Sequence, residues 1–165
     1  MTFSREQWIE KLQLQPHVEG GYYRRTFESS HRPVQATPNG SRYAMTSIFY
    51  LLSADSPVGH FHRNQSDIMH VFHSGASITY FLIYPDGELQ VRTLGSDIDS
   101  GEELQFVAPG GVWKASTLNP GHDYGLLSEV VVPGFDFADM TLGQAAILQR
   151  RFPQHSELIQ RYCKS

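Results

Sequence analysis

The chain has 165 residues, a formal net charge of −4, eight histidines and one cysteine. At this length a single unit buries roughly 68–70% of the surface that its unfolded chain exposes, so residues 1–165 are expected to form one domain. No block of like charges occurs, which argues against a nucleic-acid partner and a membrane surface. Cys163 has no partner for an internal disulfide, and no signal peptide or long apolar run is recognisable, so a soluble, cytoplasmic protein is expected.

The first predicted element is a helix over Ser4–Leu14, because Ser4 and Gln7 have the spacing of a capping box. Residues 20–29 are aromatic and β-branched and predict a strand. The next stretch, over 29–41, is polar and contains two prolines and an Asn-Gly pair. We expect it to be a loop rather than a core element.

Short strands separated by turns are predicted for most of the remaining chain. They lie within residues 43–53, 60–75 as a pair, 77–83, 89–94, 104–109, 112–117 and 126–135. So many short strands favour an all-β sandwich or barrel. Helical spacing returns over 142–149 and 158–162, on either side of Pro153, which predicts helices at the carboxyl end.

Four of the eight histidines fall between residues 60 and 73. His60 and His62 are two residues apart, so on a regular strand both side chains point to one face. Asp67 follows and is expected on the next strand, after a turn over 63–66. Two histidines and an acid are typical ligands of a mononuclear metal site, so His60, His62 and Asp67 are candidate metal ligands and a divalent metal is a candidate cofactor. The alternative is that one histidine faces solvent or serves only as a hydrogen-bonding group.

Glu129 is an ionisable residue within the apolar run LLSEVVV. Burial of a carboxylate is costly, so Glu129 is expected to face a polar cavity or to have a raised pKa and a partner. The alternative is an acid on an edge strand, exposed to solvent or paired with an arginine.

Aromatic and cationic residues supply further candidates for ligand binding. The aromatic candidates, for which core packing is the alternative, are Tyr80, Tyr84, Trp113, Phe135 and Phe137. The cationic candidates for an anionic group are Arg24, Arg63 and Lys114. The histidines expected at the surface are His17, His31, His122 and His155.

Residues 54–75 resemble the first cupin motif, G-x5-H-x-H-x3,4-E-x6-G. His60 and His62 match its histidine pair and Asp67 stands at the position of the glutamate, whereas Ala54 replaces the first glycine. The segment 109–111 resembles the P-x-G of the second motif. In that motif a histidine normally follows as the last metal ligand, and here the position is Lys114.

Three longer stretches, LQLQPHVEGGYYRRTF, HRNQSD and VVVPGFDFADMTL, are similar to the cupin 5 branch of this superfamily. The resemblance implies an all-β cupin double-stranded β-helix, a jelly-roll barrel with flanking N- and C-terminal helices, and a homodimer. It also implies a pocket inside the barrel where His60, His62, Trp113 and Glu129 converge. The chain departs from the branch after Asp67, where the usual D-E-x-W-H-F-Y pattern is replaced by DIMHVFH.

The leading functional hypothesis is a cupin that binds a sugar-like or carboxylated small molecule and catalyses an epimerisation or isomerisation. His62 would act as the base, Asp67 would orient it, and Tyr80 is the candidate acid. The second hypothesis is a metal-dependent oxygenase or isomerase using His60, His62 and Asp67 or Glu129. The third is a non-catalytic ligand-binding module.

Overall fold

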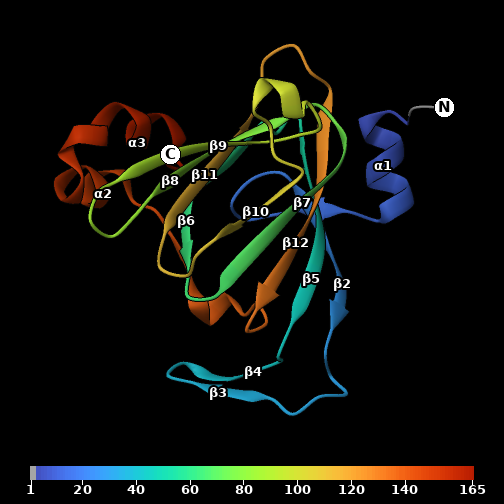
Figure 1. Ribbon diagram of the computed structural model, residues 1–165, viewed down its shortest axis with the longest axis vertical. Helices are drawn as coiled ribbons and strands as arrows, with labels where there is room; N and C mark the ends of the chain where they lie inside the picture. Colours follow the sequence, from blue (N-terminus) through green and yellow to red (C-terminus); the bar gives the residue numbers. More distant parts are fainter. Residues whose placement is uncertain (1–2) are drawn as a thin grey trace.

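The computed structural model describes residues 3–165 and shows two antiparallel sheets packed face to face (Figure 1). The six-stranded sheet consists, in sheet order, of β1 (Gln15–Pro16), β2 (Tyr22–Glu28), β5 (Thr46–Ser53), β12 (Tyr124–Val132), β7 (Asp67–Gly75) and β10 (Gln105–Ala108). The five-stranded sheet consists of β13 (Met140–Leu142), β6 (Val58–Asn64), β11 (Trp113–Leu118), β8 (Ile78–Ile83) and β9 (Leu89–Leu94). The predicted all-β jelly-roll barrel is confirmed.

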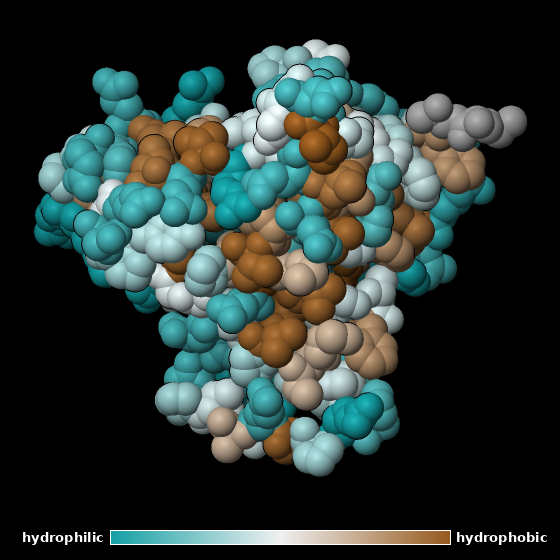
Figure 2. Space-filling model, in the orientation of Figure 1, coloured by the Kyte–Doolittle hydropathy of each residue, from teal (hydrophilic) through white to brown (hydrophobic). Residues whose placement is uncertain are grey.

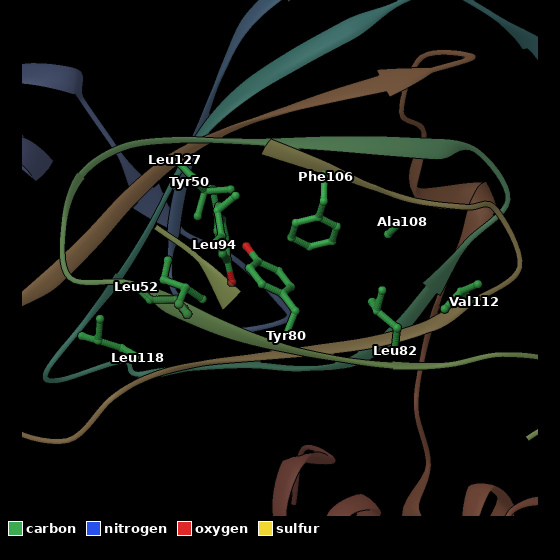
Figure 3. Packing of buried hydrophobic residues seen from close by; sticks show 11 residues of the cluster. Tyr50, Leu52, Tyr80, Leu82, Leu94, Phe106, Ala108, Val112, Leu118 and Leu127 are labelled. Carbon is green, nitrogen blue, oxygen red and sulfur yellow. The ribbon is translucent and has the colours of Figure 1, made fainter. Parts of the chain in front are cut away.

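The main hydrophobic core fills one part of the space between the two sheets (Figure 3). Strand alternation sends every second side chain into this space, so Tyr80 and Leu82 of β8 face Tyr50 and Leu127 of the opposite sheet. These four side chains are at most 1% exposed. The apolar core holds the two sheets at a fixed separation, which sets the width of the polar interior described below.

Helices cover the outside of the barrel at both ends of the chain, as predicted. Helix α1 (Arg5–Leu12) begins at the expected capping box, in which Ser4 Oγ accepts from the Gln7 amide at 3.3 Å and Gln7 Oε1 accepts from the Ser4 amide at 2.9 Å. Helices α2 (Ala145–Arg151) and α3 (Ser156–Tyr162) pack on the outer face of the five-stranded sheet. None of the helices in residues 3–165 is long and apolar enough to cross a membrane.

The outer face of the six-stranded sheet carries apolar side chains. Met69 of β7 lies directly beside Val107 of β10, and Val132 of β12 is exposed at the end of its strand. Figure 2 shows apolar side chains gathered over this part of the surface.

The stretch 29–41 is not simply a loop, which corrects the prediction. It contains β3 (Gln35–Thr37), which pairs with β4 (Gly40–Arg42) in a hairpin that extends away from the two main sheets (Figure 1). The hairpin needs little apolar sequence because an ion pair anchors it: Arg42 Nε lies 2.6 Å from Asp139 Oδ2, and both side chains are buried. Asp139 ends the short 3₁₀ helix η2 (Phe137–Asp139), so the hairpin is tied to that segment.

Packing of α2 on the barrel predicts a contrast between two adjacent positions. Leu148 is 1% exposed within the cluster formed by Phe61 and Phe152, whereas Ile147 is 49% exposed. Leu148→Ala should lower the free energy of unfolding by about 2–5 kcal/mol because it removes buried contacts and leaves a cavity. Ile147→Ala should cost less than about 1 kcal/mol. Urea denaturation measures both values, and equal losses would contradict this description of the helix.

Candidate functional site

A cavity of about 340 Å³ opens at one end of the barrel. Its buried wall is largely polar, and its more exposed rim carries aromatic and charged side chains. The residues that line it are Gln15, His17, Glu19, Tyr23, Arg25, Ile48, His62, Asn64, Ile68, Glu129, Val131, Phe135, Asp136 and Phe137. The volume suits a ligand the size of a small metabolite.

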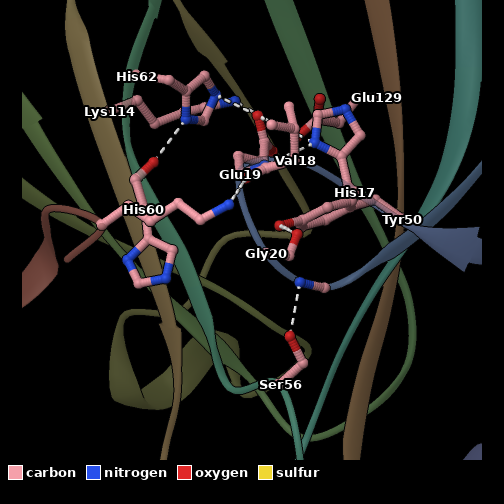
Figure 4. A network of polar contacts seen from close by, with 12 residues as sticks. His17, Val18, Glu19, Gly20, Tyr50, Ser56, His60, His62, Lys114 and Glu129 are labelled. Atoms are coloured by element: carbon pink, nitrogen blue, oxygen red, sulfur yellow. Dashed lines mark hydrogen bonds and ion pairs between the residues drawn. The ribbon is translucent and has the colours of Figure 1, made fainter. Parts of the chain in front are cut away.

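Glu19 and His62 form a close pair on this wall (Figure 4). His62 Nε2 lies 3.0 Å from Glu19 Oε2, and the side chains are 3% and 7% exposed. The other ring nitrogen, Nδ1, lies 2.8 Å from the carbonyl oxygen of His60, which can only accept, so Nδ1 carries a hydrogen. The remaining proton of the pair is therefore placed between Nε2 and the Glu19 carboxylate.

The electrostatics of Glu19 favour its ionised form. Burial opposes ionisation, but the neighbouring His62 imidazole and its hydrogen bond outweigh burial, and His17 adds to their effect, so the pKa of Glu19 lies below its ordinary value. His17 Nδ1 is 3.7 Å from the same carboxylate oxygen. The arrangement is suited to general acid-base chemistry, because an ionised carboxylate and an imidazole share one proton beside a cavity.

The loop 17–21 places Glu19 against β6. Gly20 has a φ of +104° and passes so close to β6 that a Cβ atom would lie 2.0 Å from the carbonyl oxygen of Val58. The Glu19 carbonyl accepts from the His60 amide at 2.6 Å. Glycine at position 20 is thus required for the loop to bring the carboxylate to His62.

A second polar cluster joins the two sheets inside the barrel. Strand register places His70 directly opposite Glu129 in one sheet and Lys114 directly opposite His62 in the other. Lys114 Nζ lies 2.7 Å from His70 Nε2 and 3.3 Å from Glu129 Oε1, and His70 Nε2 is 3.2 Å from the same carboxylate oxygen. All three side chains are at most 7% exposed.

Each member of this cluster affects the charge of the others. Burial, followed by the Lys114 ammonium, lowers the pKa of His70 to about 4, so His70 is neutral near pH 7. Burial opposes ionisation of Glu129, but the charges of Lys114 and His70 outweigh it and hold the pKa of Glu129 well below its usual range. Glu129 therefore faces the cavity and has a partner, as expected, whereas its pKa moves down rather than up.

His60 does not join His62 inside the barrel. Between the pairs Lys114–His62 and Ser116–Gly59, β6 has two residues where β11 has one, which is a β-bulge. The bulge breaks the alternation, and the His60 ring lies away from the cavity with Nδ1 3.3 Å from the carbonyl oxygen of Tyr162 (Figure 4). The expectation that both imidazoles share one face is therefore wrong.

Asp67 also lies apart from His62. Its carboxylate is at the exposed start of β7 and accepts from the Gly110 amide at 2.8 Å. The set of His60, His62 and Asp67 is thus not brought together. In the part of the chain that the structure describes, no three His, Cys, Asp or Glu side chains are grouped as metal ligands. Position 114, where the second cupin motif normally supplies the last metal ligand, also does not fit a metal ion, because its lysine ammonium is a cation that contacts His70 and Glu129.

The structure separates the remaining predicted residues into two groups. Lys114, Glu129 and Phe135 lie inside the barrel or on the cavity wall, and Tyr80 lies in the core with its ring 4.9 Å from that of His70. Burial raises the pKa of Tyr80 well above its ordinary value. Three residues lie elsewhere: Arg63 stacks at 4.9 Å on Trp113, which packs under the carboxyl-terminal helices, and Arg24 contacts Gln13.

Sequence reasoning missed four residues of the site. Glu19 and His17 lie in a loop, and His17 was expected at the surface although its side chain is 5% exposed. Arg25, rather than Arg24, lines the cavity, because β2 alternates and Tyr23 and Arg25 share the inner face. His70 is buried because alternate residues of β7 point into the barrel, and nothing else in the sequence distinguishes it from its neighbours on that strand. One signal for Glu19 was present in the sequence: it directly precedes Gly20-Gly21, and such a glycine pair is typical of a loop that passes close to another part of the backbone.

Two facing antiparallel sheets that enclose a polar site between them define a cupin barrel, and this is the class of protein to which the chain belongs. Within that class, the chain belongs to the family described as Cupin superfamily (DUF985), whose model matches residues 6–143.

Several known proteins are similar over most of the chain. Uncharacterized protein YML079W of Saccharomyces cerevisiae is 43% identical over 150 residues, which cover 84% of this chain and 74% of that protein. The structure of a hypothetical protein from Leishmania major has a TM-score of 0.92 and 31% identity, with 99% of this chain and 100% of the other covered. Protein SO0799 from Shewanella oneidensis has a TM-score of 0.89 and 36% identity, with 99% of each chain covered.

The likeness to more distant cupins concerns the fold alone. An oxalate decarboxylase of Bacillus subtilis superposes with a TM-score of 0.56 at 12% identity, covering 97% of this chain and 38% of the other.

The neutral, buried state of His70 predicts a loss of stability in mild acid. The unfolded chain takes up a proton on this histidine below about pH 6.5, whereas the folded chain does so only near pH 4. Stability from His70 is therefore present above about pH 6.5 and is lost as the pH falls toward 4, by about 3 kcal/mol in total. His70→Gln, which keeps an acceptor for Lys114, should reduce the loss measured by urea denaturation at several pH values.

The exposed His31 supplies the matched control, because His31→Gln should keep the wild-type pH dependence. Burial also lowers the pKa values of His60 and His73, so His70→Gln should remove only part of the loss. An unchanged slope in the His70 variant would contradict the assignment of a neutral buried imidazole.

Proposed function

We propose that this protein is a small-molecule enzyme that transfers protons to and from a ligand bound in the barrel cavity, with Glu19 and His62 as the acid-base pair. The observation that carries the proposal is the 3.0 Å contact between two almost fully buried titratable groups on the cavity wall. This keeps the predicted role of His62 and replaces Asp67 by Glu19 as its partner.

The chemistry follows from the arrangement of charge in the pair. The Glu19 carboxylate accepts a proton from a ligand carbon next to a carbonyl group, and the electron pair of that bond moves onto the carbonyl oxygen. The His62 imidazole retains a proton that can be returned to the ligand. Because the two groups contact each other at 3.0 Å, they lie on the same face of the ligand, and return of a proton to a neighbouring atom gives an isomer. A buried site makes each charge interaction stronger than it is in water.

The cavity favours a polar ligand of modest size with one anionic or strongly polar end. Glu19, His62 and Asn64 supply hydrogen-bonding groups on the buried wall, and Phe135 and Phe137 supply apolar contact nearer the rim. Arg25 lies exposed on the rim, where its guanidinium donates to the carbonyl of Phe135 at 3.1 Å and to Glu28 Oε2 at 3.4 Å. The pair with Glu28 is solvent-exposed and contributes little, so a carboxylate or phosphate in the cavity can compete for this guanidinium. A sugar-like or carboxylated carbonyl compound satisfies these requirements.

Proton transfer predicts exchange of ligand hydrogen with solvent. A thermal-shift screen of sugars, sugar phosphates and keto or hydroxy acids would identify ligands, and proton NMR in D₂O would follow loss of the signal from the acidic carbon. Glu19→Gln and His62→Asn should each slow this exchange by about 10²- to 10⁴-fold while the ligand still shifts the melting temperature. Asp99→Asn and His31→Asn, at exposed positions, should leave the exchange rate unchanged.

The outcomes of this assay separate the competing hypotheses. If ligand hydrogen exchanged at the wild-type rate in both Glu19→Gln and His62→Asn, these two residues would not be the acid-base pair. Ligands that stabilise the protein but show no exchange and no conversion would point to a non-catalytic binding module. Sedimentation velocity on the same preparation measures the oligomeric state, for which a homodimer stays a prediction.

Two adjacent arginines allow a matched test of where the ligand binds. Arg25 lines the cavity, whereas Arg24 points to the other face of β2 toward Gln13. Arg25→Met should weaken binding of an anionic ligand about tenfold or more, because a charge-assisted hydrogen bond contributes roughly 1.5–3 kcal/mol. Arg24→Met should leave the dissociation constant close to that of the wild type. Titration calorimetry compares the two, and the reverse order would place the ligand outside this cavity.

A further inference from the structure

We propose that the Lys114 ammonium is the resident cation of the barrel interior: it occupies the position between His70 and Glu129 that a divalent ion would take and makes this polar centre independent of metal. The proposal concerns the second polar cluster and does not depend on proton transfer by Glu19 and His62.

The geometry of the cluster is that of a bound cation. A single charged atom, Lys114 Nζ, is within 3.3 Å of an imidazole nitrogen and a carboxylate oxygen that are themselves 3.2 Å apart. The imidazole comes from β7, the carboxylate from β12 and the ammonium from β11 of the facing sheet. An ammonium has three hydrogens to donate and no acceptor, so it can satisfy both groups at once.

The hydrogen-bond pattern defines the state of His70. A charged ammonium can only donate, so Nε2 accepts from it with a lone pair, as it would toward a metal ion. This places the ring hydrogen on Nδ1, a buried atom that has no hydrogen-bond partner among the described residues. The ring is also fixed from outside the cluster, since it stacks on Phe106 with centroids 4.7 Å apart and planes 8° from parallel. His70 is thus held in the orientation and the tautomer of a metal ligand, with a lysine in the place of the ion.

Burial explains why Glu129 needs a cation beside it. Lys114 is 4% exposed and Glu129 is 6% exposed, so loss of the ammonium would leave a carboxylate without a counter-charge inside the barrel. Glu129 also lines the cavity. We infer that Lys114 is a positioning residue that keeps a charged, oriented carboxylate on the cavity wall.

The first test uses the wild-type protein without a histidine tag. Nitrogen-15 NMR of the histidine rings should show His70 with an unprotonated Nε2 and a protonated Nδ1 near pH 7. The His70 signals should not change on addition of EDTA or of an equimolar amount of Co²⁺. A doubly protonated His70 ring, or broadening of its signals by Co²⁺, would overturn the proposal.

The second test asks whether the position accepts a metal once the ammonium is removed. Lys114→His would leave two imidazoles and a carboxylate around one point, and three protein ligands are enough for a divalent ion. This variant should bind one equivalent of Co²⁺ with visible d–d absorption, and the additional change His70→Ala should abolish that absorption. Lys11→His, which replaces an exposed lysine on α1, is the control for a new surface histidine and should give no such band.

Both results are decisive. Stoichiometric, His70-dependent Co²⁺ binding by the wild type contradicts the proposal, and so does a folded Lys114→His variant that binds no Co²⁺. If Lys114→His does not fold, the wild-type NMR measurement decides the question alone. Lys114→Met adds a functional readout, since it should weaken ligand binding in the cavity and the weakening should not be reproduced by Lys11→Met.

Discussion

The interior of this barrel depends on one constraint: each buried acid must have a counter-charge within hydrogen-bonding distance. Glu129 lies in the middle of a sheet, and its ionised form is tolerated because Lys114 approaches from the facing sheet. Glu19 is buried to the same degree and depends on His62. Both partners are neighbours on the five-stranded sheet, so the relative placement of the two sheets determines whether the polar centre exists.

Much of the fold could be predicted because its signals are local. The capping box of α1, the short alternating strands and the helical spacing after residue 142 each depend on residues that are close in sequence. The β3–β4 hairpin could not be predicted in this way. Its anchor is an ion pair between Arg42 and Asp139, which are 97 residues apart, and a polar segment held by such a distant partner resembles an ordinary loop in sequence.

The site was predicted less completely, for three physical reasons. A single β-bulge changed the face of His60, so a spacing argument that holds for a regular strand failed. Adjacent residues of a strand point to opposite faces, so only one of Arg24 and Arg25 can reach the cavity. The prediction chose Arg24, which is one residue away from the arginine that lines it. Glu19 reaches the site from a loop, and a loop has no periodicity from which its direction can be derived. Glu129, and His62 on the part of β6 that follows the bulge, both face the interior, as their positions on strands predict.

The bulge in β6 also changes what position 60 contributes. Its amide donates to the Glu19 carbonyl and its carbonyl accepts from His62 Nδ1, so one peptide segment holds both members of the acid-base pair. The imidazole of His60 takes no part in either contact. The support of the pair by position 60 therefore depends on the path of the main chain and not on which side chain stands there. Proline, which lacks the amide hydrogen, is the one residue type that this constraint excludes directly.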